Sequence, residues 1–432
     1  MAERLLVRDA IAIDPERGRL GLRTAIVEEG RLRELVEGPG PSPRPGDERL
    51  DASGLLLLPG LIDLHCHLRE PGEEGKETIA TGGRAAAAGG FTAVVAMPNT
   101  RPPIDDGPLV DWVARRARET SPVRVHVAGA VSAGQAGEKL AELAAMRASG
   151  VVAFTDDGRP IMNAALMRRA LEWGKLLGVP VVAHEEDAHL GGGAAHEGPV
   201  ATRLGLRGSP SQAEEIMVRR DIALCELTGG RLHVAHVSAA GSVRALREAK
   251  ARGVPVTAEA TPHHFTLTED AIDGYDTHAK MSPPLRALAD RDAVREGLAD
   301  GTLDAIATDH APHGVADKQI EFERAQNGVV GLETALSLGL ALCDAGVLDE
   351  RRLVQLFTSG PARAFSLPGG SLAPGSPADL VLVDREAAWT VDPARFLSRG
   401  RNSPFAGMRL RGRVRATIVG GRVVHRGETH GG

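Results

Sequence analysis

The sequence predicts an α/β fold: a (β/α)8 TIM barrel with a small β-sandwich domain formed by the N- and C-terminal segments. Three observations favour it. Eight short apolar runs alternate with helix-forming stretches, both ends of the chain have β-type sequence, and 432 residues suit a large barrel with a smaller attached unit. We expect the barrel at residues 58–367 and the sandwich at residues 1–57 and 368–432.

The two ends of the chain read as short strands and turns. Apolar runs occur at 5–7, 10–13 and 24–27, and the Gly- and Pro-rich stretch at 38–46 must be an exposed loop. After residue 368 a turn leads into the apolar run Leu380–Val383, and residues 416–424 resemble a tight hairpin. The simplest architecture brings these N- and C-terminal strands together beside the barrel.

The central region has a regular β-then-α rhythm. Its apolar runs are Leu61–Leu64, Thr92–Met97, Val123–Ala130, Val151–Phe154, Pro180–Ala183, Leu232–Ala235, Pro255–Ala258 and Leu303–Ala307. The stretches between them, such as Leu109–Glu119 and Ala165–Leu177, have helix-forming composition. Eight such units predict a barrel whose active site lies at the C-terminal ends of the strands.

Composition excludes several classes of function. The net charge of −6 and the isoelectric point near 6.2 give no electrostatic case for binding nucleic acid or an anionic membrane. The N-terminus lacks the apolar region of a signal peptide, and no run of 18 apolar residues occurs. Three cysteines far apart imply no disulfide framework. We therefore expect a soluble cytoplasmic protein.

The most informative motif is the histidine pair at the end of the first barrel strand. In a strand, residues i and i+2 project from the same face, so His65 and His67 can direct two imidazoles at one cation while Cys66 points away. Arg69, just past the strand, could hold an anionic substrate beside that cation. Such a pair, taken alone, is more often two ordinary histidines.

Further ligand-type side chains follow the other strands. They are Asp156 and Asp157 after the fourth strand, His184 after the fifth, His236 after the sixth and Asp309 after the eighth. Because the C-terminal ends of the strands meet at one end of a barrel, we expect these groups to converge. Imidazole and carboxylate ligands suit a borderline divalent metal such as zinc. Six ligands exceed the need of one catalytic zinc, which favours a two-metal site with a bridging carboxylate.

Each member also has a purely structural interpretation. His184 and His236, taken singly, fit hydrogen-bonded histidines at the edge of the core. Asp156 and Asp157 precede Gly158 and could form a plain turn. His263 and the adjacent His264 could be packing or substrate contacts and are left unassigned. The joint pattern favours the metal site.

Asp309 is the candidate catalytic residue. A carboxylate at the last strand can bind the metal, accept a proton from water and deliver it to a leaving nitrogen. It could instead cap the turn that contains Ala311-Pro312-His313. A bound metal lowers the pKa of water toward ~7 and polarises a carbonyl group. Together these properties point to hydrolysis of an amide, or its reversal.

Several motifs resemble dihydroorotase of the amidohydrolase superfamily. The residues that carry the resemblance are Pro59–Gly72, Ala96–Thr100, Phe154–Gly158, Ala183–Glu186, Thr261–His264 and Ala307–His313. The resemblance spans nearly the whole chain, and the first and last of these motifs together are highly specific.

The resemblance implies which residues form the site. The implied metal ligands are His65, His67, Asp157, His184, His236 and Asp309. Residues 140–174 contain no lysine that could be carboxylated as in hydantoinases, which favours the class I-like type with an aspartate bridging the metals. Asp157 rather than Asp156 is the preferred bridge. The implied cofactor is Zn²⁺, one or two ions per subunit and more consistent with two.

The resemblance also implies the substrate contacts. They are His67, Arg69, Asn99, His313 and the position of Ser282. Two departures affect recognition of the ring: Ser282 stands where the family has asparagine, and Gln326-Asn327 replaces Pro-Phe. Serine is shorter and cannot supply the paired donor and acceptor of an amide.

The expected activity is the reversible interconversion of dihydroorotate and N-carbamoyl-L-aspartate in pyrimidine biosynthesis. One alternative is another cyclic-amide hydrolase: a hydantoinase, dihydropyrimidinase or allantoinase. A second is a non-catalytic partner of aspartate carbamoyltransferase, which is disfavoured because all six ligands are present. Association with that transferase and a homo-oligomeric state are expected from the family.

Overall fold

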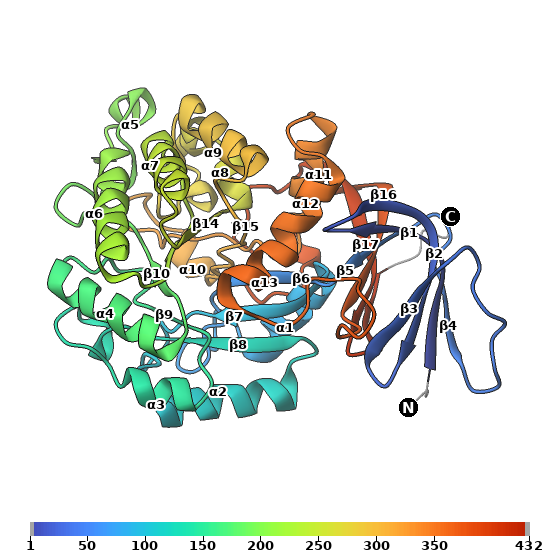
Figure 1. Cartoon of the computed structure of the whole chain (residues 1–432). Helices are drawn as coiled ribbons and strands as arrows, with labels where there is room; N and C mark the ends of the chain where they lie inside the picture. The colour runs from blue at the N-terminus through green and yellow to red at the C-terminus, as the bar shows by residue number, and fades with distance from the viewer. Residues whose placement is uncertain (1–3, 428–432) are drawn as a thin grey trace.

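The computed structural model describes residues 4–427 and contains a barrel of eight parallel strands with an attached second sheet (Figure 1). The barrel strands are β6 (Leu61–Cys66), β7 (Phe91–Ala96), β8 (Arg124–Gly129), β9 (Ala153–Thr155), β10 (Val181–Ala183), β13 (Leu232–Val234), β14 (Val256–Ala260) and β15 (Ala305–Ile306). They pair in chain order from β6 to β15. Each of the eight apolar runs predicted from the sequence coincides with one of these strands.

The barrel closes between its first and last strands. Cys66 on β6 forms a parallel bridge to His310, and the His67 amide donates to the His310 carbonyl oxygen at 2.8 Å. The buried carboxylate of Asp63 accepts hydrogen bonds from the Thr308 amide at 2.9 Å and from the Thr308 hydroxyl at 2.5 Å. A side chain from the first strand thus ties the last strand to it.

Helices surround the barrel on its outer side (Figure 1). The helices of the described residues are α1 (Ile79–Ala88), α2 (Gly107–Thr120), α3 (Leu143–Ala148), α4 (Ala164–Leu177), α5 (Pro199–Leu204), α6 (Gln212–Thr228), α7 (Ala240–Ala251), α8 (Pro262–Thr266), α9 (Leu288–Asp300), α10 (Val315–Lys318), α11 (Ala335–Asp344), α12 (Glu350–Phe357) and α13 (Ser359–Phe365). Of these, α10 lies in the loop after β15, and α13 packs against inward-facing residues of the barrel strands. Side-chain caps begin several of them: Asp106 accepts from the Leu109 amide, and Asn163 accepts from the Ala165 and Leu166 amides. Four short 3-10 helices lie at Ala133–Gln135, Glu269–Tyr275, Thr277–Ala279 and Pro393–Arg395.

The second sheet joins the two ends of the chain. Its strands are β1 (Arg4–Asp14), β2 (Gly18–Glu28), β3 (Arg31–Glu37), β4 (Glu48–Asp51), β5 (Leu56–Pro59), β16 (Leu380–Thr390), β17 (Arg409–Val419) and β18 (Arg422–Arg426). One edge of β1 pairs with both β4 and β5, so the sheet branches there. Leu32 and Leu50 from one arm and Leu380 and Ile418 from the other belong to a single hydrophobic cluster. The predicted association of the chain ends is confirmed, and their strands form one branched sheet.

Two features bear on the sequence predictions. The seventh barrel strand, β14, extends to Ala260, two residues beyond the predicted Ala258, and so includes Glu259. A small additional pair of strands, β11 (Ala195–His196) and β12 (Gly208–Ser209), lies outside the barrel. The domain limits at 57/58 and 367/368 stay predictions. None of the helices in the described residues is long and apolar enough to cross a membrane.

Candidate metal centre

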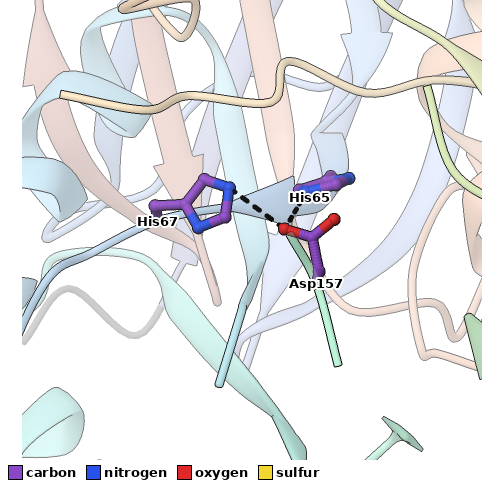
Figure 2. Close-up of side chains that lie close together, drawn as sticks. All are labelled: His65, His67 and Asp157. Carbon is purple, nitrogen blue, oxygen red and sulfur yellow. Dashed lines mark ion pairs between the residues drawn. The ribbon is translucent and has the colours of Figure 1, made fainter. Parts of the chain in front are cut away.

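Asp157 lies between two pairs of histidines. Its Oδ2 is 3.2 Å from His65 Nε2 and 3.5 Å from His67 Nε2, as Figure 2 shows. Its Oδ1 is 3.6 Å from His184 Nδ1 and 3.5 Å from His236 Nε2. Within each of these two groups, one ligand atom from every residue lies within 4.8 Å of the others. One carboxylate therefore gives one oxygen to each imidazole pair.

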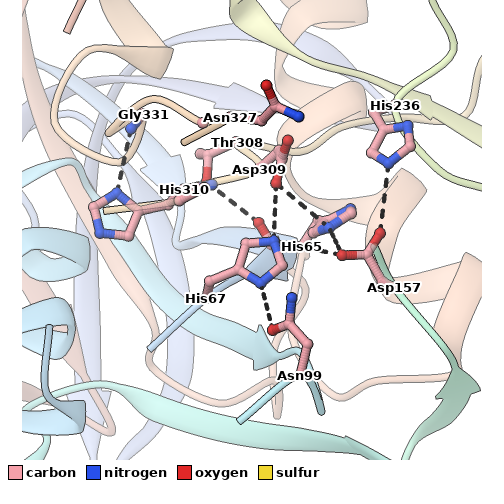
Figure 3. A network of polar contacts seen from close by, with 12 residues as sticks. His65, His67, Asn99, Asp157, His236, Thr308, Asp309, His310, Asn327 and Gly331 are labelled. Atoms are coloured by element: carbon pink, nitrogen blue, oxygen red, sulfur yellow. Dashed lines mark hydrogen bonds and ion pairs between the residues drawn. The ribbon is translucent and has the colours of Figure 1, made fainter. Parts of the chain in front are cut away.

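Asp309 completes the first group from the other side of the barrel seam. Its Oδ1 is 3.0 Å from His67 Nε2 and 3.5 Å from His65 Nε2 (Figure 3). The backbone of Asp309 has φ of 44°, and that of His236 has φ of 32°. Both values lie in the left-handed region that side chains other than glycine rarely adopt, and such residues cluster at functional sites.

Oxygen atoms outside the cluster contact three of its imidazoles, two of them through hydrogen bonds. Glu259 Oε1 lies 2.9 Å from His65 Nδ1, and Asn99 Oδ1 lies 2.9 Å from His67 Nδ1. Glu186 Oε2 lies 3.6 Å from His184 Nε2. A ring nitrogen bonded to an outer acceptor carries the proton and leaves the other nitrogen as a lone-pair donor. The inward nitrogens of His65 and His67 are thereby prepared as ligands.

Charge in the cluster favours a cation. Although burial favours its neutral form, the neighbouring imidazoles of His65, His184 and His236 hold the pKa of Asp157 well below its ordinary value. Burial also opposes ionisation of Asp309, yet His65 and His67 lower its pKa. Both carboxylates are therefore anionic at neutral pH.

The donor set fits a divalent metal. Among the described residues, His65 Nε2 and Asp157 Oδ1 are buried atoms that have no hydrogen-bond partner. Buried polar atoms of native proteins rarely lack a partner, because desolvation of an unpaired group costs about 1–3 kcal/mol. Imidazole nitrogens and carboxylate oxygens at the mouth of a barrel are suitable ligands for such an ion. The cluster therefore has the composition and the geometry of a metal-binding site.

A cavity of about 410 Å³ opens beside the cluster. Asp157, Arg69, Asn99, His313 and Gln326 are among the residues that line it. Arg69 is buried, with Nε donating to the Pro312 carbonyl oxygen at 3.4 Å, and His313 Nε2 lies 2.8 Å from the Asn327 carbonyl oxygen. Three of the predicted substrate contacts therefore share one cavity.

Ser282 occupies a different position from the other predicted contacts. It is half-buried, and it is not among the described residues that line this cavity. Gln326 does line the cavity, while Asn327 contributes its backbone carbonyl to His313. A substrate contact at Ser282 stays a prediction.

Asp156 has a structural environment. Its Oδ1 accepts a hydrogen bond from the Ser132 amide at 3.0 Å, and its Oδ2 accepts from the Ser132 hydroxyl. The side chain thus ties the end of β9 to the loop after β8. This geometry separates Asp156 from Asp157, as strand alternation predicts.

Two buried residues near the cluster were not assigned from the sequence. Glu259 on β14 contacts His65 through Oε1 and His233 Nε2 through Oε2 at 3.1 Å. His263 is buried, and this burial lowers its pKa to about 4 against the opposing charge of Asp309. An acidic residue at the end of an apolar strand is the sequence signal for Glu259, but the predicted strand stopped one residue short.

Sequence comparisons with known proteins indicate the family of the chain. The Dihydro-orotase-like family pattern matches residues 54–242, and the Amidohydrolase family pattern matches residues 226–425. A dihydroorotase from Anaeromyxobacter dehalogenans is 58% identical over 429 residues, covering 98% of both chains. A dihydroorotase from Geobacter metallireducens is 48% identical over 423 residues, covering 98% of this chain and 99% of the other.

Solved structures of cyclic-amide hydrolases have the same fold. The L-hydantoinase (dihydropyrimidinase) of Arthrobacter aurescens superposes with a TM-score of 0.88 at 25% identity, covering 98% of this chain and 96% of that one. The D-hydantoinase (dihydropyrimidinase) from Thermus sp. has a TM-score of 0.84 at 27% identity, with 98% and 95% covered. With near full-length relatives at 48% to 58% identity, the chain belongs to the dihydroorotase family of amidohydrolases, hydrolases that act on cyclic amides.

Proposed function

We propose that the protein is a zinc-dependent dihydroorotase that interconverts (S)-dihydroorotate and N-carbamoyl-L-aspartate in de novo pyrimidine (UMP) biosynthesis. The observation that carries this proposal is the Asp157 carboxylate between two imidazole pairs, beside a cavity that contains Arg69. The dihydroorotases at 48% to 58% identity support the choice of substrate.

Two zinc ions are the proposed cofactors. His65, His67, Asp157 and Asp309 would hold one ion, and His184, His236 and Asp157 would hold the other. When bound, such ions acidify water and polarise a carbonyl group.

Asp309 is the proposed proton carrier. For hydrolysis, its carboxylate accepts a proton from the water that attacks the ring amide carbonyl carbon. The carbon–nitrogen bond then breaks, and Asp309 delivers the proton to the departing ring nitrogen. In the biosynthetic direction the same carboxylate removes a proton from the carbamoyl nitrogen and returns it to the leaving water. His67 holds Asp309 at 3.0 Å, which keeps the carboxylate beside the reacting groups.

Arg69, Asn99 and His313 are the proposed contacts for the substrate carboxylate and ring. A guanidinium can make two parallel hydrogen bonds to a carboxylate, and burial strengthens this pairing. Arg69 is suited to the role because its Nε is fixed by Pro312 while the group lines the cavity. His67 and Ser282 remain further proposed contacts.

The test is turnover by purified protein loaded with Zn²⁺. We expect interconversion of dihydroorotate and N-carbamoyl-L-aspartate between pH 6 and 9, with about two equivalents of zinc per subunit by elemental analysis. Absence of turnover in both directions, with the protein folded, metal-loaded and tested alone and with aspartate carbamoyltransferase, would overturn the proposal.

A second candidate activity is hydrolysis of a neutral cyclic amide. The superposition on L-hydantoinase, with a TM-score of 0.88, favours it. The buried cationic side chain of Arg69 in the cavity argues for a substrate that bears a carboxylate. Faster turnover of hydantoin or dihydrouracil than of dihydroorotate would establish the second candidate.

Partners and location follow the family. We infer a homo-oligomeric cytoplasmic enzyme that associates with aspartate carbamoyltransferase. A catalytically inactive partner of that transferase is disfavoured, because all six proposed ligands are present and converge. Light scattering of the protein with and without the transferase tests the association.

A further inference from the structure

Two buried lysines hold the segment that borders the substrate cavity. Lysine is rare in this chain, with six among 51 basic residues. Lys280 and Lys318 are 6% and 3% exposed. In the part of the chain that the structure describes, their ammonium groups bond to backbone carbonyl oxygens and pair with no carboxylate. A buried ammonium group that has no carboxylate within ion-pair distance is costly, so its hydrogen bonds must compensate.

Lys318 makes three such contacts at the end of α10. Its Nζ donates to the carbonyl oxygens of Thr277 at 3.0 Å, Lys280 at 3.1 Å and Gln326 at 2.6 Å. Three hydrogen bonds use every proton of an ammonium group. The side chain therefore joins the loop after β15 to the segment before β15 that contains Lys280.

Lys280 binds the same loop at two further carbonyl oxygens. Its Nζ donates to the carbonyl oxygens of Glu323 and Ala325, both at 2.8 Å. The ammonium also lies 5.6 Å from the centre of the Phe322 ring, within the range of a cation–π contact. The Gly328 amide donates to the Lys280 carbonyl oxygen at 3.0 Å.

The segment held in this way reaches the cavity. Gln326 lines the cavity, and its carbonyl oxygen is a Lys318 acceptor. The next carbonyl oxygen, that of Asn327, lies 2.8 Å from His313 Nε2. His313 also lines the cavity. The two ammonium groups are therefore linked to the cavity through Gln326 and through the hydrogen bond between Asn327 and His313.

We propose that Lys280 and Lys318 are positioning residues for substrate recognition, which hold residues 323–327 so that Gln326 and the Asn327–His313 pair meet the acidic substrate. This inference rests on the proposed dihydroorotase activity, and it identifies residues 323–327 as a segment that determines how the substrate is recognised. Arginine cannot replace either residue, because a planar guanidinium cannot direct donors to carbonyl oxygens placed around a compact ammonium. Lys280 and Lys318, which together form a clamp, act on the Gln326-Asn327 stretch, where this chain departs from its family.

The test compares Lys318→Met, Lys318→Arg and Lys280→Met with the control Lys175→Met. Lys175 Nζ also donates to a backbone carbonyl oxygen, that of Thr228, but on the outer helix α4. Misplacement of substrate contacts predicts that KM for dihydroorotate rises between about 10- and 100-fold, while kcat stays within about threefold. Zinc content is expected to match the wild-type value, and the Lys175→Met variant to keep the wild-type KM.

Hydrogen exchange gives a readout that is independent of turnover. We expect the Gly328 amide to exchange faster in all three clamp variants and at the wild-type rate in Lys175→Met. A wild-type KM in folded Lys318→Met and Lys280→Met would overturn the inference, as would full activity of Lys318→Arg. If the wild-type protein turns over neither dihydroorotate nor N-carbamoyl-L-aspartate, the proposed function fails. In that case the exchange rate of the Gly328 amide still tests the clamp, because a wild-type rate in the clamp variants would refute it.

Discussion

Removal of the Glu259 carboxylate is expected to weaken metal binding without removing a ligand. Glu259 is 1% exposed and lies 2.9 Å from His65 Nδ1 and 3.1 Å from His233 Nε2. Replacement by glutamine keeps the size of the side chain but changes the contact to His65 from a charge-assisted to a neutral hydrogen bond. Such bonds differ by about 1–1.5 kcal/mol, which corresponds to about a 5- to 15-fold loss of affinity.

Zinc affinity would be measured by competition with a chromophoric chelator. We expect Glu259→Gln to lose about tenfold in affinity and Glu259→Ala about 100-fold, within the range for outer partners of metal-binding histidines. Asp379→Asn is the matched control, because Asp379 is a buried carboxylate that pairs with Arg124 at the start of β8, at the opposite end of the barrel strands from the cluster. Zinc affinity of Glu259→Gln within twofold of the wild-type value would refute the argument that Glu259 prepares His65.

Three further predictions concern catalysis, recognition and stability. Asp309→Asn should retain His-bound zinc in elemental analysis while turnover of dihydroorotate falls about 10²- to 10⁴-fold, because the proton carrier is lost; turnover near the wild-type rate would contradict this role. Arg69→Met should raise KM for dihydroorotate at least about 30-fold, since a buried charge pair loses one partner, and an unchanged KM would remove Arg69 from the carboxylate site. Burial raises the pKa of Glu333 from 4.5 to about 7. The folded state therefore holds a proton that the unfolded state has lost between these values, and the free energy of unfolding falls as pH rises from 4.5 to 7. Glu333→Gln should make this fall smaller in urea titrations, and an identical slope would contradict the assignment.

Strand alternation and barrel geometry were sufficient to predict the central cluster. His65 and His67 face the same side because they are two residues apart, and the strand-end positions of His184, His236 and Asp309 place them at the same end of the barrel. These rules use only the spacing of residues along a strand and the position of each strand end, and the apolar runs of the sequence indicate both.

Contacts that depend on loop paths could not be predicted in this way. The choice between Asp156 and Asp157 rested on a single residue of register, and the contact of Asp156 with Ser132 becomes visible when two loops are placed together. Glu259 was missed because the predicted seventh strand ended at Ala258, whereas β14 continues to Ala260. Lys280 and Lys318 were not noticed, since their partners are backbone atoms, which carry no sequence signal.

The closing seam of the barrel has a consequence for how the protein matures. His65 and His67 lie near the start of the chain, while Asp309 arrives more than 240 residues later, next to the Thr308 that bonds Asp63. A nascent chain that has emerged only through β14 lacks both Thr308 and Asp309, so neither the contact with Asp63 nor the contact with His67 can form. Closure of the barrel and completion of the cluster therefore depend on the same last strand, and both are late events in synthesis of the chain.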